Sequence, residues 1–416
     1  MLSVRLTTLV LLFPLLLICS TSLSALTLNE ATQSAQKQNL NLHQAEANLE
    51  AARARLAQAG RLSNPDFEFG AARSNLNRNR FVAEFSQALP LSKKLSIQKT
   101  IARVDIASAA LEISDFKLGL TAEVKKNFLE SLFKEQVAEL YEELKVKKEE
   151  LLTSIRARIE AGTATAFELV TAEKEVLEAE DLLTTAIADV EAIQLTLLPL
   201  LGSNANSLET EGSLSEEIIK LERIQNLPLA SVLPQRPDYK LVEINIDRMT
   251  SEKALAKADA FGDVRLGIFV EQETGGRDDN ETFGGVRLSF PLPLWNRNQG
   301  AIKEKEALLI KGTKALAGKE LEIKADLQIA QNNRARLKAL CTKYTQTLLP
   351  ATEKAYMLAA NEYEAGKAPL ERLLQSSEAV TQAKVAILDC QKRYAQTLVQ
   401  LEKAQAGQGI FKNTKK

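Results

Sequence analysis

The side chains able to do chemistry are few and scattered in this 416-residue sequence. His43 is the single histidine, and it precedes a run of helically spaced apolar residues, which favours a solvated or packed side chain over a catalytic one. We find no nucleophile motif, phosphate-binding loop or metal-ligand spacing. Three methionines and one histidine provide no relay of soft or imidazole ligands for a metal ion. The residue types therefore predict a protein that is not an enzyme and holds no cofactor or metal.

Two cysteines, Cys341 and Cys390, lie beyond the N-terminal region, and both fall on apolar positions of helical repeats. We interpret them as buried free thiols. A disulfide stays open as an alternative, because exported proteins can form them, and a metal role is a third alternative.

Residues 1–25 have the features of a secretory signal peptide. Arg5 supplies a positive charge, residues 6–18 are apolar, and residues 22–25 are mostly small, as a cleavage site requires. We therefore expect export with cleavage of this segment. Cys19 leaves lipidation open, although Ile18 stands where a lipoprotein normally has a small residue.

The charge balance excludes some partners. There are 53 Lys and Arg residues against 54 Asp and Glu, without a long run of one sign. Nucleic acid is therefore not an expected partner, since binding it needs a clustered basic surface. We also expect no later segment that approaches the ~20 apolar residues of a membrane-spanning helix, so membrane contact would come from strands or a lipid.

An internal repeat organises the rest of the chain. Residues 64–70 match residues 261–267 at an offset of 197, and Glu160-Ala161-Gly162 matches Glu364-Ala365-Gly366 at an offset of 204. The offset grows between the strand candidates, where the second copy has a longer polar loop. We divide the chain into a first repeat, an inter-repeat linker or equatorial segment, a second repeat and a polar tail, at residues 26–202, 203–235, 236–406 and 407–416.

Apolar residues spaced alternately three and four apart predict long helices packed as coiled coils. Such stripes run through residues 42–59, 169–197, 337–358 and 373–404. One helix over about residues 300–363 would be roughly 95 Å long and bent at Pro350. Gly162 and Gly366 would form the turn of each hairpin, because glycine suits the left-handed end of a helix.

Four short segments alternate apolar with polar or small residues, which is the pattern of a membrane β-strand. We expect strands at about residues 65–72, 81–90, 263–271 and 283–292, joined in pairs by extracellular polar loops. Four strands cannot close a barrel, and open sheet edges are not tolerated in lipid. Several chains must therefore pool their strands, and three copies would form a twelve-stranded barrel. The predicted fold is mainly α with a small transmembrane β part, built from duplicated long α-helical hairpins.

This arrangement resembles the TolC family of outer-membrane efflux channels over essentially the whole mature chain. The sequence Leu-Thr-Leu-Asn-Glu-Ala at residues 26–31 is similar to the mature start of that family. Residues 291–300, Pro-Leu-Pro-Leu-Trp-Asn-Arg-Asn-Gln-Gly, are similar to the second strand-to-helix junction of its CzcC-like heavy-metal branch. Residues 90–94 resemble the first-half junction, although the glycine-rich turn usual there is missing.

The resemblance implies a homotrimer in the cell outer membrane. Its strands would form one shared β-barrel, and its hairpins would form a trimeric α-barrel through the periplasm. It further implies a periplasmic adaptor (membrane fusion) protein and an inner-membrane resistance-nodulation-division pump as partners. The chain would then be a passive exit duct in contact with outer-membrane lipid, with heavy-metal cations among its candidate substrates.

The family's helix tips face the adaptor and its inner mouth lies just beyond the second tip. The resemblance therefore implies docking residues at both tips, namely Arg158, Gly162, Thr163, Tyr363, Gly366 and Lys367. Helix termination alone is the alternative for the two glycines. It also places Glu371, Arg372 and Gln375 at the periplasmic aperture, with solvated helix charges as the alternative. Such a mixed ring departs from the acidic pattern of the best-known member, so we expect no block by cations there.

Two other functions remain open. A type I secretion exit duct would keep the fold and change the pump. A soluble periplasmic coiled-coil adaptor or scaffold would be a binding protein, but it would carry one hairpin between split β-domains, whereas this sequence has two hairpins, each with its own strand pair.

Overall fold

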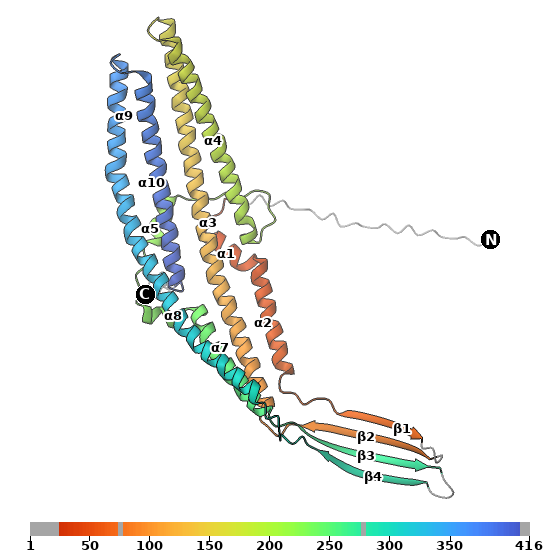
Figure 1. The fold of residues 1–416 in the computed structure, drawn as a ribbon. Coiled ribbons are helices and arrows are strands. Elements are labelled where there is room, and N and C mark those ends of the chain that lie inside the picture. Colours follow the sequence, from red (N-terminus) through yellow and green to blue (C-terminus); the bar gives the residue numbers. More distant parts are fainter. Residues whose placement is uncertain (1–24, 74–77, 276–279, 408–416) are drawn as a thin grey trace, which may run out of the picture.

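The computed structural model describes residues 25–73, 78–275 and 280–407, and these form an elongated molecule (Figure 1). A four-stranded sheet lies at one end, and the turns of two helical hairpins lie at the other (Figure 1). The predicted class, mainly α with a small β part, is confirmed. Nearly all of the expected signal peptide, the middle of both polar strand connections and most of the expected tail lie outside the described residues.

The first half of the chain supplies two short helices, a strand pair and the first long hairpin. Thr27 and Asn39 cap the two short helices by accepting hydrogen bonds from backbone N–H groups of the first turn. In order, the elements are α1 (Leu28–Gln38), α2 (Leu40–Gln58), β1 (Asp66–Arg73), β2 (Asn79–Leu89), α3 (Lys94–Glu160) and α4 (Ala166–Leu201). Helix α3 has 67 residues and reaches from the sheet to the far tip (Figure 1).

The second half repeats this order after a short connecting segment. That segment holds α5 (Leu214–Leu221), α6 (Leu229–Val232) and a 3-10 turn (Leu233–Gln235). The repeat then comprises α7 (Pro237–Ala258), β3 (Val264–Thr274), β4 (Glu281–Ser289), α8 (Gln299–Lys343), a π-helical turn η2 (Tyr344–Leu348), α9 (Leu349–Glu364) and α10 (Leu370–Ala404).

Three apolar clusters hold the helices together along their length. One near the tips joins both hairpins through Ile155, Leu370 and Leu373. A second packs α1 on α3 and α4, and a third packs α3, α8 and α10 around the connecting segment. Some of these residues, such as Leu337, Leu373 and Tyr394, lie on the stripes that the sequence indicates, and there the stripe spacing explains the packing. The cluster residues of α1 and α3 lie on no predicted stripe.

The long rod formed by α8 and α9 changes direction at η2 (Figure 1). Pro350 lies two residues after the end of this π turn and has no N–H to donate to the preceding turn. The extra residue per turn in η2 accommodates that missing hydrogen bond. The bend expected at Pro350 therefore has a defined local cause.

The interpretation of the cysteines as free thiols was wrong. Cys341 of α8 and Cys390 of α10 form a disulfide, with their Cα atoms 5.6 Å apart. Both occupy apolar positions of antiparallel neighbours at the same level, so their Cβ atoms face each other at a distance that suits a disulfide. His43, in contrast, is exposed on α2, and its Nδ1 lies 3.1 Å from a Glu46 carboxylate oxygen.

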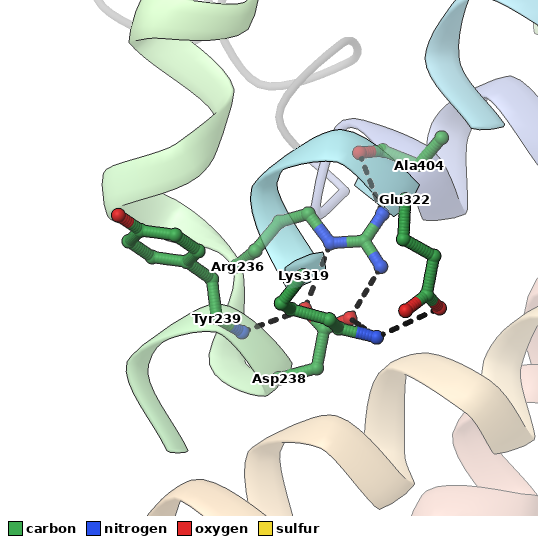
Figure 2. Close-up of polar contacts among 6 residues, drawn as sticks. All are labelled: Arg236, Asp238, Tyr239, Lys319, Glu322 and Ala404. Atoms are coloured by element: carbon green, nitrogen blue, oxygen red, sulfur yellow. Dashed lines mark hydrogen bonds and ion pairs between the residues drawn. The ribbon is translucent and has the colours of Figure 1, made fainter. Parts of the chain in front are cut away.

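A buried ionic network fixes the start of α7 against α8 and the end of α10 (Figure 2). Both carboxylate oxygens of Asp238 accept hydrogen bonds from Arg236, at 2.8 and 2.6 Å, and Lys319 lies 3.1 Å from Asp238. Arg236 also donates to the carbonyl oxygen of Ala404 at 3.1 Å. Burial alone would raise the pKa of Asp238, but the Arg236 and Lys319 charges outweigh it and lower the pKa to about 2.

Among the described helices, α4 is long and apolar enough to cross a membrane by composition, contrary to our expectation for segments after the N-terminus. One side of α4 packs on α3 through Ala172, Ala179 and Ala186. Its other side carries exposed apolar residues, including Phe167, Val170 and Leu177. Because both sides of α4 are apolar, its mean hydropathy is high even though the helix packs in a bundle.

Candidate functional site

The two hairpin tips have the same turn geometry and lie at the same end of the molecule (Figure 1). Gly162 and Gly366 adopt φ angles of +71° and +68°, in the left-handed region that favours glycine. At the first tip, Gly162 N–H donates to Ile159 and Thr163 N–H donates to Arg158, at 2.9 and 2.8 Å. The second tip repeats both hydrogen bonds at 3.0 and 2.8 Å, through the N–H groups of Gly366 and Lys367. Both helices therefore end in a Schellman motif.

Four of the six predicted docking residues are exposed at these tips, namely Gly162, Thr163, Gly366 and Lys367. Arg158 is half-buried, and Tyr363 is buried between the hairpins. The structure thus brings the two tips together but divides the six residues between an exposed surface and an internal contact.

Tyr363 joins the second tip to both helices of the first hairpin. Its ring centre lies 4.9 Å from the Arg158 guanidinium, and its hydroxyl donates to Glu168 at 3.4 Å. Burial raises the pKa of Tyr363, with Arg158 opposing and Glu168 reinforcing the shift, so the phenol stays protonated at neutral pH. Glu168 also caps α4 through a reciprocal capping box with Thr165.

The aperture candidates occupy the first turns of α10, and all three are exposed. Arg372 forms an ion pair with Glu362 of α9 at 3.1 Å. Glu371 and Gln375 lie four residues apart and therefore share one face of the helix. Arg372 therefore has a carboxylate partner on α9.

The sheet has the order β1-β2-β3-β4 with antiparallel neighbours, which leaves β1 and β4 as open edges. The register aligns side chains into rows, such as Phe67, Phe85, Ile268 and Val286. The rows on this face are mostly apolar and largely exposed. An exposed apolar face with two unpaired edges needs both a hydrocarbon environment and partner strands.

The opposite face of the sheet carries all of the charged side chains of the strands except Arg73, which ends β1 on the apolar face. Within the strands it has three arginines, Arg80, Arg265 and Arg287, and six carboxylates, Asp66, Glu68, Glu84, Glu271, Glu273 and Glu281. Arg265 pairs with Asp66 at 2.6 Å, Arg80 donates to Glu271 at 2.7 Å, and Arg287 pairs with Glu84. The Arg287 guanidinium also lies 4.9 Å from the Phe269 ring centre. This face is polar and acidic, as the wall of a water-filled channel would be.

Sequence reasoning missed Glu168, Glu362 and the exposed apolar side of α4. The two glutamates look like ordinary surface charges until the fold brings α4 and α9 to Tyr363 and α10. The apolar side of α4 does have a sequence signal, because Phe167, Val170 and Leu177 fall between the heptad positions and form a second stripe.

Comparisons with known proteins agree with this architecture. Residues 31–203 and 229–407 match the family model described as outer membrane efflux protein. The cobalt-zinc-cadmium resistance protein CzcC of Cupriavidus metallidurans is 22% identical over 375 residues, covering 87% of this chain and 86% of CzcC. A membrane protein of Pseudomonas aeruginosa has a TM-score of 0.77 at 20% identity, covering 91% of this chain and 92% of that one. CusC has a TM-score of 0.77 at 14% identity, covering 91% of both chains.

The resemblance that the sequence indicates is therefore confirmed. The family model covers most of both repeats, and the solved structures share the fold over nine-tenths of the chain. The chain belongs to the outer membrane efflux protein family, whose members are efflux channels and not enzymes.

Proposed function

We propose that this chain is one subunit of a homotrimeric outer-membrane duct in a tripartite efflux system. Three four-stranded sheets would close one β-barrel, and the helical hairpins would extend into the periplasm as an α-barrel. The observation that carries the proposal is the open sheet, which has one exposed apolar face, one charged face and two unpaired edges. Such a sheet is stable in lipid only when partner strands satisfy both edges.

The proposal divides the chain by repeat, with residues 26–202 and 236–406 each supplying a strand pair and a hairpin. The exposed tip residues Gly162, Thr163, Gly366 and Lys367 would meet a periplasmic adaptor, and Arg158 and Tyr363 would hold the two tips in register. Glu371 and Gln375 would line the inner mouth. An inner-membrane pump would supply the driving energy.

Heavy-metal cations are the proposed cargo, and the similarity to CzcC supports them. Deletion of the gene should increase sensitivity to cobalt, zinc or cadmium more than to antibiotics. A selective loss of antibiotic resistance would overturn the metal assignment while leaving the duct intact. Loss of protein secretion from the deletion strain would instead support a type I secretion duct.

The duct itself is tested by charging its apolar face. Val286→Arg places a charge on an exposed position of the apolar face of β4 and should cost about 2–4 kcal/mol in the bilayer. Heat-modifiable trimers in the outer-membrane fraction should be lost.

Ser289→Arg is the matched control, because it lies on the charged face of the same strand. It should leave the trimers in place. Wild-type protein that fractionates as a soluble monomer would refute the duct.

A further inference from the structure

The four connections between the sheet and the helices gather at one level of the molecule, where the rod meets the sheet (Figure 1). Lys94 forms an ion pair with Asp263, and Gln87 donates to the carbonyl oxygen of Ser63 at 3.0 Å. Asn298 donates to the carbonyl oxygen of Ala256 at 2.7 Å, and Gly262 lies directly beside Pro291. These contacts join residues 59–65, 90–99, 256–263 and 290–299 into one structure, which we call the collar.

The collar exposes large apolar side chains, each more than half accessible: Leu62, Leu91, Phe261, Phe290, Leu292, Leu294 and Trp295. Phe290 and Leu292 continue the apolar row of β4 beyond the end of the strand, in step with Val286 and Leu288. Trp295 is 87% exposed. The collar is therefore continuous with the face that we assign to hydrocarbon, and it ends in an indole, a group that prefers the boundary between lipid and water.

The collar is also basic, although the whole chain has a net charge of −1. Its aspartates are Asp259 and Asp263, and its basic residues are Arg61, Lys93, Lys94, Lys99, Lys257 and Arg297. Lys94 pairs with Asp263. Among the described residues, five exposed basic side chains of the collar form no ion pair: Arg61, Lys93, Lys99, Lys257 and Arg297. Solvated charges alone would explain any one of them, but not their gathering beside exposed apolar side chains.

We propose that the collar binds the headgroups of anionic phospholipids in the periplasmic leaflet of the outer membrane. Phosphate oxygens would accept hydrogen bonds from the ammonium groups and from the terminal guanidinium nitrogens, while the acyl chains lie along Phe290 and Leu292. The Nε atoms of Arg61 and Arg297 already donate to backbone carbonyl oxygens. Trp295 would lie at the depth of the headgroups. The inference rests on the proposed function, because it requires the sheet to span the membrane.

Trp295 is the single tryptophan of the sequence, so its fluorescence reports on the collar without a label. The full-length mature protein is reconstituted into phosphatidylcholine vesicles that contain either brominated phosphatidylglycerol or brominated phosphatidylcholine at equal mole fraction. We expect quenching of Trp295 by both lipids, with a relative association constant at least about twofold higher for phosphatidylglycerol.

The test variant carries R61Q, K93Q, K99Q, K257Q and R297Q. It should lose the preference for phosphatidylglycerol while quenching by phosphatidylcholine persists. The control variant carries K311Q and K314Q, two exposed lysines of α8 beyond the collar, and should keep the preference.

The outcomes separate the two proposals. Equal quenching of the wild type by both lipids would overturn the headgroup assignment and leave the duct standing. If neither lipid quenches Trp295, one explanation is that the collar does not contact lipid and the sheet does not span the membrane, which would contradict both proposals. The other explanation is that a second copy of the chain covers Trp295. Trimers with normal channel conductance would identify coverage by a second copy. That result would also overturn the assignment of the collar to lipid headgroups.

Discussion

At the residue scale, each of the two tips places a glycine at a position where the backbone has a positive φ angle. Gly162 and Gly366 have nearly equal positive φ angles, and a Cβ atom on either would meet no heavy atom within 4 Å. The demand for glycine therefore comes from the backbone and not from crowding. Any adaptor contact at these tips would add to this requirement and would not replace it.

Replacing either tip glycine tests this reading. Gly162→Ala or Gly366→Ala should lower the free energy of unfolding of its hairpin by about 1 kcal/mol, because alanine is strained at these angles. Thermal unfolding of the purified protein measures the loss. Gly119→Ala is the matched control, since Gly119 lies inside α3 with open space around its Cβ position and should gain about 1 kcal/mol in helix propensity. Equal effects at all three sites would contradict the backbone explanation.

Tyr363 is one of the residues that join the two tips. Tyr363→Ala should cost about 3 kcal/mol, because it removes a buried ring from the contact with Arg158 and Leu370. Tyr363→Phe keeps the ring and loses only the long hydrogen bond to Glu168, so its cost should be below about 1 kcal/mol. Amide hydrogen exchange at residues 155–170 should accelerate in the alanine variant and stay near wild type in the phenylalanine variant. Acceleration confined to the second tip would show that the hairpins are independent.

At the element scale, the second hairpin differs from the first in two ways. A π turn and Pro350 interrupt its outer rod, and a disulfide links that rod to α10 at the level of the π turn. The first hairpin has Val137 and Ala186 at the positions equivalent to Cys341 and Cys390 by the repeat offset, and α3 continues without interruption. The second hairpin therefore has a bend directly above a covalent clamp, which fixes where its upper part can move.

The start of α7 depends on a buried charge network whose strength varies with pH. The folded-state pKa of Asp238 is lowered to about 2 from an ordinary value of 3.8. A lowered carboxyl pKa stabilises the fold above the ordinary value, and this stability is lost as pH falls through the folded value. We expect a loss of up to about 2 kcal/mol between pH 4 and pH 2, measured by chemical unfolding at each pH.

A substitution isolates this contribution. Asp238→Asn should remove the acid dependence and destabilise the protein by about 3 kcal/mol at neutral pH, because Arg236 stays buried without its carboxylate. Glu322→Gln removes only an exposed partner of Lys319 and should cost less than about 1 kcal/mol. If the asparagine variant still loses the same free energy of unfolding between pH 4 and pH 2, the pH dependence comes from other groups.

The sequence was sufficient to predict the four strands and several of the long helices, but no stripe marked the 67-residue α3, and the contacts between elements were not predicted. Heptad stripes and period-two alternation reflect which side faces a neighbour, so they indicated both hairpins and the alternating strand faces. The pairing of Cys341 with Cys390 depends on the relative height of two helices, which a stripe does not specify. Likewise, Lys319 is 81 residues from Asp238, and Glu168 is 195 residues from Tyr363, so only the fold brings them together.

At the scale of the whole molecule, the two faces of the sheet suit the two environments of a membrane duct, lipid on the outside and water on the inside. The apolar face continues into the basic collar, and the opposite face carries six carboxylates against three arginines within the strands. In a closed trimer, the acidic face would surround the water. The charge that a cation meets would then come from the barrel wall as well as from the inner mouth.

This wall predicts an ion preference that mutation can shift in both directions. Glu68 and Glu281 form no ion pair among the described residues, so Glu68→Gln with Glu281→Gln removes wall charge without releasing an arginine. That variant should lower the cation preference measured as a reversal potential across a planar bilayer, because fewer fixed negative charges attract cations into the pore. Arg80→Gln frees the Glu271 carboxylate and should raise the same preference.

Both shifts should shrink at high salt, where the Debye length falls to about 3 Å at 1 M and the wall charge is screened. If neither variant moves the reversal potential while Glu371→Gln does, the inner mouth alone sets selectivity and the sheet's charged face serves only to keep that surface wet.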